Sequence, residues 1–320
     1  MIRSTIPISV AIRTAATKDS IGPAWVFSAA NDGWLNSTLQ KNTGFSGTRF
    51  ISPDNGDESS MIDTLSKSNE RSLIITENKH LFRLCNWLVK DGFRRLPKAL
   101  LVLVLEDFAM HGEYYAGDTR QIGRILRIPV LEPATYQETV DAIGWGTHVS
   151  EKTGLPVLIR LSKNMFTEKA RVFYNHSHAD PEPAGIGITH TVSPEFPDSQ
   201  EIMLNLSAQS DMNRFAIGSN RSLGILACGI TFPLVMEIKD KLDLEFPVLK
   251  IGQYPLPGKL MHKLFAECRE VLVLEEGEHV YEEWIRGYFD QEQIKGRLDG
   301  TLPRVGELTP PVIVNTLLRR

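Results

Sequence analysis

The chain has 320 residues, of which 42% are hydrophobic and 23% charged, the balance of an ordinary globular protein. Its 35 Lys and Arg residues against 39 Asp and Glu give a net charge of −4, without a long basic run, which argues against a nucleic-acid-binding surface. The longest purely apolar run, Ala99 to Leu105, is far shorter than the roughly 20 residues of a membrane-spanning helix, and no signal peptide is recognisable, so we expect a cytoplasmic protein.

The cysteines are too few and too scattered for a disulfide framework or a metal site. Cys85, Cys228 and Cys268 stand among apolar neighbours, and none has the C-x-x-C spacing of a zinc or iron–sulfur site. We therefore expect buried, reduced thiols and no metal ligands in this chain. Any cluster chemistry would belong to another chain.

The first half of the chain alternates β-rich runs with helical patterns. Ser72 to Thr76 and Ala99 to Leu105 are apolar on both faces, as strands of a buried parallel sheet are. Between them, residues 81–89 repeat apolar side chains at helical spacing. Two more strands are expected at 129–131 and 156–161. This pattern predicts a β/α alternation.

A helix is expected between the last two of these strands. Thr135 can cap its N-terminus, and Glu138 follows three residues later, which is the spacing of a capping box.

From about residue 162 to residue 220 the pattern dissolves, and a second α/β unit then begins. We expect its strands at 223–228, 247–251 and 270–274, joined by single helices and therefore by right-handed parallel crossovers. At about 100–200 residues per domain, two domains are expected. The sequence thus predicts two open, mainly parallel-sheet, three-layer α/β domains at 1–165 and 220–320, with a linker at 166–219.

The second half also carries the most specific motifs. Val271 to Glu276 is a buried strand that ends in paired carboxylates, and His279 to Glu283, Gly296 to Gly300 and Leu302 to Pro310 follow it. In this order the motifs resemble the indolepyruvate ferredoxin oxidoreductase alpha subunit, within the 2-oxoacid:ferredoxin oxidoreductase family. Matching stretches of the first half occur in the same order, for example Asp118-Thr119-Arg120. The resemblance covers roughly residues 70–165 and 220–316.

This resemblance implies a fold and a cofactor. The first domain would be a pyrimidine-binding domain that holds the aminopyrimidine ring of thiamine diphosphate, and the second a transketolase-C-like domain. Subunits of the family continue into a diphosphate-binding domain, with a Gly-Asp-Gly motif and an Asn that hold magnesium, and a ferredoxin-like domain rich in cysteine. Neither motif occurs in these residues. The resemblance therefore implies that the diphosphate site, magnesium and any iron–sulfur clusters lie on partner subunits.

In relatives, a glutamate hydrogen-bonds N1′ of the pyrimidine ring and so promotes removal of the C2 proton of the cofactor. The corresponding position here is Asn55, and Glu58 or Asp57 can take this role if the loop shifts by a few residues. The alternative is that residues 54–58 form only a polar turn at a helix N-terminus.

Three further residues are candidates for the site. Asn31 follows a strand-like run, where it can contact the cofactor or substrate or simply cap the next helix. His80 aligns with the histidine of a Lys-His pair in relatives and can bind a substrate carboxylate or shuttle a proton, unless it is a solvated loop residue. His111, past the strand at 99–105, is placed similarly. We name Glu58, His80 and His111 as candidate catalytic residues, and Glu58, Asn55 and Asn31 as candidate cofactor-binding residues.

Other charged residues have a structural interpretation. Asp118 and Arg120 can form an interface ion pair instead of belonging to the site. The pairs Glu275-Glu276 and Glu282-Glu283 are expected to have a structural or inter-subunit role, because the second domain is distant from the cofactor in relatives.

The resemblance implies a subunit of a thiamine-diphosphate-dependent 2-oxoacid oxidoreductase, active only with a partner chain. A 2-oxo acid, with aryl pyruvates as the family-level expectation, would be oxidatively decarboxylated, and electrons would pass through partner subunits to ferredoxin. Two alternatives remain open. One is a non-oxidative thiamine-diphosphate decarboxylase or carboligase half-subunit. The other is a catalytically degenerate assembly subunit.

Overall fold

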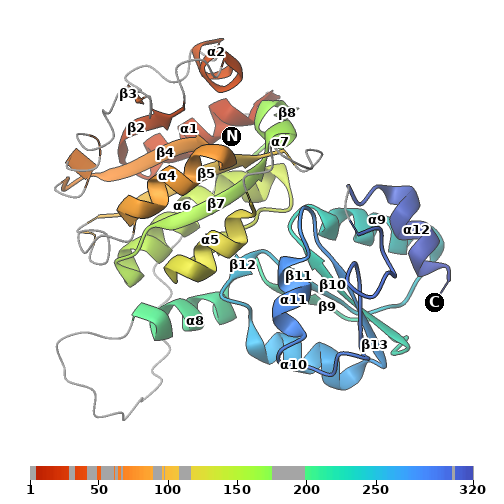
Figure 1. Ribbon diagram of the computed structural model, residues 1–320. Coiled ribbons are helices and arrows are strands. Elements are labelled where there is room, and N and C mark those ends of the chain that lie inside the picture. Colours follow the sequence, from red (N-terminus) through yellow and green to blue (C-terminus); the bar gives the residue numbers. More distant parts are fainter. Residues whose placement is uncertain are drawn as a thin grey trace, which may run out of the picture.

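In the computed structural model, the described residues are 5–28, 33–41, 49–51, 61, 64–65, 68–88, 96, 98–107, 117–174, 199–304 and 307–319. They form two α/β units, each built around its own sheet (Figure 1). None of the helices among these residues combines the length and the apolar character needed to cross a membrane.

The first sheet has seven strands in the order β12-β6-β7-β5-β4-β2-β3. All neighbouring strands are parallel except β12, which pairs antiparallel with β6. Its strands are β2 (Ile21–Phe27), β3 (Arg49–Ile51), β4 (Arg71–Glu77), β5 (Leu100–Glu106), β6 (Val130–Leu131), β7 (Val157–Ser162) and β12 (Gln253–Tyr254).

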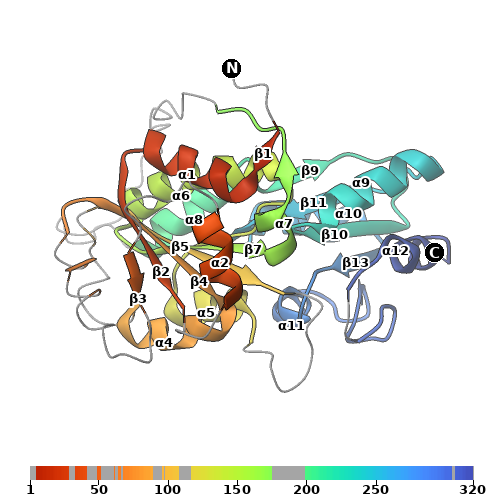
Figure 2. The same ribbon diagram turned by 90° about the horizontal axis from the view of Figure 1, so that it is seen from above.

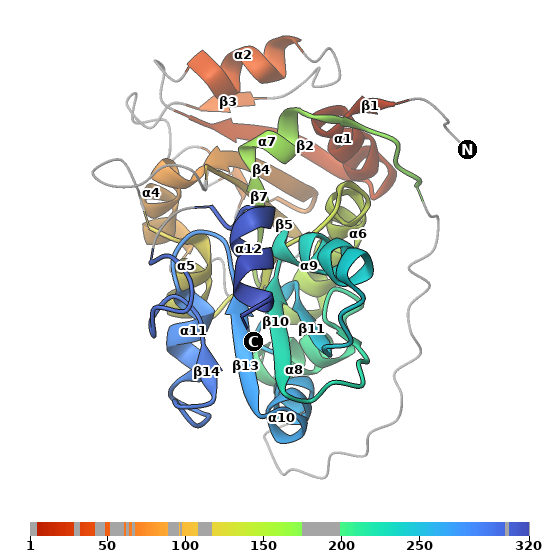
Figure 3. The same cartoon turned by 90° about the vertical axis from the view of Figure 1, so that its right-hand side faces the viewer.

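Helices cover both faces of this sheet, which is why its central strands are apolar throughout. Along β4, Leu73 packs in the core beneath α1 (Ile8–Lys18) and α6 (Tyr136–Thr153), whereas its neighbour Ile74 packs in the opposite core. That opposite core lies beneath α4 (Asn78–Leu88) and α5 (Thr119–Leu126). Figures 2 and 3 show the two helix pairs on opposite sides of the strands. Alternate side chains thus serve two cores.

The predicted start of α6 is confirmed. The Thr135 side chain accepts a hydrogen bond from the Glu138 amide (3.2 Å), and Glu138 Oε2 accepts one from the amide of Ala134 (2.8 Å). Each interaction provides a partner for a backbone donor that the helix itself leaves without one. At the other end, Gly154 takes φ = +66°, a left-handed conformation that glycine adopts without strain.

The second sheet has five strands in the order β14-β13-β10-β11-β9, all parallel except for the antiparallel pair β11–β9. The strands expected at 223–228, 247–251 and 270–274 are present as its three central strands. Its strands are β9 (Arg214–Ala216), β10 (Leu223–Cys228), β11 (Val248–Ile251), β13 (Glu270–Leu274) and β14 (Ile294–Lys295).

Two helices contribute to the core on each face of this sheet. α10 (Gly258–Glu267) and α11 (Val280–Ile285) pack in one core, and α9 (Thr231–Leu242) and α12 (Pro310–Leu317) pack in the other. With helices on both faces of two mostly parallel sheets, the predicted α/β class is confirmed.

Short elements link the two units. In the stretch expected as a linker, β8 (Lys169–Ala170) pairs with β1 (Ile6–Pro7), and β9 joins the second sheet. The helix α8 (Ser199–Gln209) lies in the same stretch, near α6 and α10. Conversely, β12 comes from the second half of the chain but pairs with β6 and so extends the first sheet. The domain boundaries at 165 and 220 stay a prediction.

The remaining described helices are α2 (Gly33–Lys41) and α7 (Lys163–Thr167), the latter directly following β7.

Candidate functional site

The carboxyl ends of four parallel strands meet at one edge of the first sheet. The register aligns Phe27 of β2 with Thr76 of β4, and Glu106 of β5 with Ser162 of β7. Ligands of open α/β sheets bind beyond such an edge. We call it the carboxyl edge.

Of the residues expected at the site, His80 lies among the described residues. It occupies the first turn of α4, directly after β4, and its ring lies edge-on to Phe27 with 6.3 Å between ring centroids. His80 is half-buried in a helix, so it is not the solvated loop residue considered as its alternative. Asn31, Asn55, Glu58 and His111 lie outside the described residues, and their roles stay predictions.

Sequence reasoning missed Glu77, the last residue of β4. Its carboxylate is buried and forms ion pairs with Lys163 through Oε1 and with Lys79 through Oε2, the latter at 3.4 Å. Lys163 Nζ also lies 5.0 Å from the ring centroid of Trp34 on α2. Glu77 Oε2 accepts no hydrogen bond in the described structure. The carboxyl edge therefore has a buried anion flanked by two lysines.

Next to it, Asn78 and Glu106 connect three elements. Glu106 Oε1 accepts hydrogen bonds from Asn78 Nδ2 (3.1 Å) and from the amide of Thr119 (2.9 Å). Asn78 Nδ2 also donates to the carbonyl of Gly117, which leaves Asn78 Oδ1 buried with no hydrogen bond to the described residues. Because both contacts of Nδ2 are to acceptors, they fix the orientation of the amide, and its oxygen is available to a donor.

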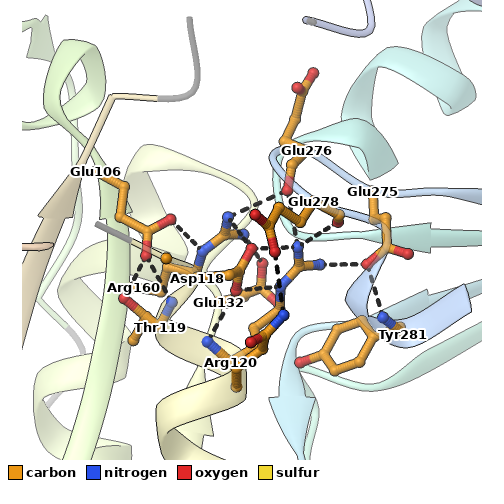
Figure 4. A network of polar contacts seen from close by, with 12 residues as sticks. Glu106, Asp118, Thr119, Arg120, Glu132, Arg160, Glu275, Glu276, Glu278 and Tyr281 are labelled. Carbon is orange, nitrogen blue, oxygen red and sulfur yellow. Dashed lines mark hydrogen bonds and ion pairs between the residues drawn. The ribbon is translucent and has the colours of Figure 1, made fainter. Parts of the chain in front are cut away.

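Two buried arginines extend this network toward the second sheet (Figure 4). Arg160, in the middle of β7, donates from Nε to Glu106 (2.7 Å), from Nη1 to Glu132 (2.6 Å) and from Nη2 to Asp118 (3.2 Å). Arg120, on α5, donates from Nη2 to the same Asp118 (2.6 Å). Asp118 therefore lies between the two guanidiniums.

Arg120 also reaches across to the second unit. Its Nη1 donates to Glu275 Oε2 at 2.6 Å, and its Nη2 donates to the carbonyls of Glu276 (3.0 Å) and Glu278 (2.9 Å). Glu275 accepts two more hydrogen bonds, from the amides of Tyr281 and Glu282, both at 2.9 Å. The turn between β13 and α11 is thus held against α5, and Asp118 and Arg120 form an ion pair where the two units meet (Figure 4).

The pKa values of these carboxyl groups are driven in opposite directions. Burial opposes ionisation of Asp118, but the guanidiniums of Arg120 and Arg160 outweigh it and lower the pKa of Asp118 to about 2. For Glu275, burial dominates over the attraction of Arg120 and raises the pKa to about 7. Burial also raises the pKa of Glu106, against the effect of Arg160.

A small cavity lies beside this network, where β6, β7, β10 and β13 end. The space open to the centre of a water-sized sphere is about 10 Å³, room for roughly one water molecule. It is lined by Glu132, Pro133, Arg160, Ser162, Cys228, Gly229, Ile230 and Glu276. Among the described residues, no group of three or more His, Cys, Asp and Glu side chains is arranged to hold a metal ion.

The fold and the carboxyl edge define an α/β chain with polar groups gathered at the ends of parallel strands.

No family model matches the sequence. Curated relatives named indolepyruvate oxidoreductase subunit IorA do match it. The protein of Methanothermobacter thermautotrophicus is 29% identical over 248 residues, which are 70% of this chain and 39% of the relative. That of Pyrococcus horikoshii is 29% identical over 232 residues, 66% of this chain and 36% of the relative.

The IorA protein of Archaeoglobus fulgidus is 26% identical over 217 residues, 63% of this chain and 34% of the relative. The chain thus spans less than two-fifths of the length of these three relatives. The expected resemblance to the indolepyruvate ferredoxin oxidoreductase alpha subunit is confirmed.

A solved structure supports the fold. The 2-oxoglutarate:ferredoxin oxidoreductase from Magnetococcus marinus, determined with 2-oxoglutarate, coenzyme A and succinyl-CoA bound, superposes with a TM-score of 0.66. The match covers 99% of this chain and 65% of that chain at 13% sequence identity, so it bears on the fold alone.

Proposed function

We propose that this chain is a subunit of a thiamine-diphosphate-dependent 2-oxoacid oxidoreductase and contributes the surface that binds the aminopyrimidine ring of the cofactor. The observation that carries the proposal is the similarity to IorA subunits over about two thirds of the chain. A similar fold in an oxidoreductase that acts on a 2-oxo acid agrees with it.

The carboxyl edge offers groups that fit such a ring. An aminopyrimidine presents an amino donor, and the edge holds two buried oxygens without a hydrogen bond to the described residues, Asn78 Oδ1 and Glu77 Oε2. When bound, thiamine diphosphate supplies the carbanion that attacks the oxo group and the electron sink for decarboxylation. The chain would orient the ring, with Glu58 or its neighbour Asp57 facing N1′.

His80 and the lysines would act on the substrate side. His80 lies at the start of α4, beside the end of β2, where its ring can donate a hydrogen bond to the carboxylate of a 2-oxo acid. Lys163 and Lys79 add positive charge around Glu77 that favours an anionic substrate.

The other groups that the reaction needs would be supplied by residues outside these 320. In this proposal, the diphosphate group and magnesium are bound by a partner subunit, and electrons leave through iron–sulfur clusters to ferredoxin. These expectations rest on the resemblance stated above.

A second candidate is an assembly subunit that positions a catalytic partner. It is favoured by Asn55, which stands where relatives have the glutamate that contacts the pyrimidine ring. Both candidates predict a complex, so they are distinguished by the effect of substitutions in this chain on the turnover of the complex.

The test begins with the complex purified from its native host and analysed for bound thiamine diphosphate and metals. Glu58→Gln is then compared with Glu201→Gln, a matched change at an exposed position in the first turn of α8. Loss of a proton-transfer group lowers kcat by about 10²-fold or more, so we expect this loss for Glu58→Gln alone. Unchanged turnover in both variants would remove Glu58 from the mechanism and favour the assembly subunit. Absence of the cofactor from the purified complex would contradict the proposal as a whole.

A further inference from the structure

The buried charges between the two sheets do not balance. The six residues with the direct contacts described above form what we call the inter-sheet charge cluster. Four of them are carboxylic acids and two are arginines, and none is more than 4% exposed. The members are Glu106, Asp118, Arg120, Glu132, Arg160 and Glu275.

The surroundings do not remove this excess of two acids. Arg297 and Glu276 are also buried, but they add one charge of each sign. Glu282 is paired with Arg286 at 2.8 Å. A buried ion without compensation is unfavourable by several kcal/mol, so a buried acid takes up a proton instead of staying ionised.

The cluster also borders the small cavity. Glu132 Oε1 accepts from Arg160, whereas Glu132 Oε2 has no hydrogen-bond partner in the described structure. Glu132 lines the cavity, which has room for about one water molecule.

We propose that the inter-sheet charge cluster holds a proton near neutral pH, and that releasing this proton loosens the contact between α5 and the β13–α11 turn. This contact, which we call the joint between the two units, is thereby sensitive to pH. This inference does not depend on the proposed function.

Glu275 is the member through which the proton acts on the joint. Three acids of the cluster belong to the first unit, and Glu275 alone comes from the second. When all are ionised, like charges on the two sides of the joint oppose the attraction between Arg120 and Glu275. The groups that act on Glu275 come from the elements around it and are Asp118, Arg120, Cys228, Tyr281, Glu282 and Arg297.

Two neighbours of Glu275 that can lose a proton do not change charge near neutral pH. Burial raises the pKa of Cys228 and of Tyr281 well above their usual values, so both stay neutral. The pKa of Glu275, raised from 4.5 to about 7, sets the window. A folded-state pKa above the unfolded value gives stability that is complete below about pH 4.5 and is lost as the pH rises through about 7.

The loosening is local because other contacts that do not involve Glu275 also join the two units. β12 pairs with β6, and Trp145 Nε1 donates to Gln253 at 2.7 Å. These contacts stay in place while the turn at 275–279 moves away from α5.

Hydrogen exchange followed by mass spectrometry tests the proposal on the full chain. Wild type, Glu275→Gln and the control Glu283→Gln are compared at about pH 6 and about pH 8, with rates corrected for the intrinsic effect of pH. Glu283 is exposed on α11, one residue beyond Glu282. We expect peptides from 118–127 and 275–285 to exchange about tenfold faster at the higher pH in wild type and Glu283→Gln, and equally at both in Glu275→Gln. Equal corrected rates in wild type would overturn the proposal.

A measurement on the wild type alone decides the matter if Glu275→Gln does not fold. In protein labelled with ¹³C at the glutamate carboxyl carbon, we expect a resonance that titrates with a midpoint near 7, which Glu275 matches. If every glutamate resonance titrates below about pH 5.5, the cluster holds no proton at neutral pH and the proposal fails.

Discussion

Arg120 and Glu275 are 155 positions apart in the sequence, yet Arg120 Nη1 and Glu275 Oε2 meet at 2.6 Å in the buried space between the two sheets. The local structure of α5 prepares this contact. Asp118 caps the helix by accepting the amide hydrogen of Arg120 (2.9 Å), and the same Oδ1 accepts from Arg120 Nε (2.8 Å). The cap therefore also holds the guanidinium in the direction of Glu275.

Replacing Arg120 by alanine should lower the free energy of unfolding by about 3–5 kcal/mol, because Asp118, which stays ionised at neutral pH, would keep buried negative charge without this partner. Denaturant unfolding at neutral pH measures the change. Arg124→Ala is the control, since Arg124 is exposed on the same helix and lies 4.6 Å from the ring centroid of Trp284. An exposed cation–π contact is worth about 1 kcal/mol or less. Equal losses for the two variants would contradict the role given to the buried pair.

Much of the fold could be predicted because two-sided burial leaves a clear pattern. Strands such as Leu100–Glu106 are buried at every residue, and an apolar run of that length is typical of a central strand in a parallel sheet. The short strands β9 and β12 could not be predicted. They have three and two residues, too few to show a period, and their pairing depends on the strand beside them in the folded chain.

The site was predictable to a smaller extent. Asp118, Arg120 and Glu275 stand out in the sequence as parts of motifs, but their meeting depends on packing between the two units. Arg160 lies in a stretch that matches the family but had no expected role, although the sequence holds a signal for one. A charged residue inside the otherwise apolar β7 must find a partner when it is buried, and the same holds for Lys250 in β11, which pairs with Glu138.

Asp118 should make stability depend on pH on the acid side. Its pKa is lowered from 3.8 to about 2, so the stability that it contributes is present above about pH 3.8 and lost as the pH falls through 2. We predict that Asp118→Asn is less stable than wild type at about pH 5, and that the difference shrinks by about 2 kcal/mol by pH 2. Unfolding free energies across this range measure it. A constant difference would show that Asp118 is not selectively stabilised as an anion.

Gly252 connects β11 to β12, where the chain crosses from one sheet to the other, and its carbonyl accepts from the amide of Glu132 at 2.7 Å. A Cβ at this position would lie 2.7 Å from the carbonyl oxygen of Met212, a backbone atom that cannot turn away. We therefore predict that Gly252→Ala lowers the free energy of unfolding by about 1–3 kcal/mol, the usual effect of overpacking. Gly258→Ala is the matched control, since a Cβ there meets no atom within 4 Å. At the first residue of α10 it should be neutral or stabilising by up to about 1 kcal/mol. Thermal unfolding of both variants measures the contrast, and an unchanged midpoint for Gly252→Ala would mean that the crossing tolerates a side chain.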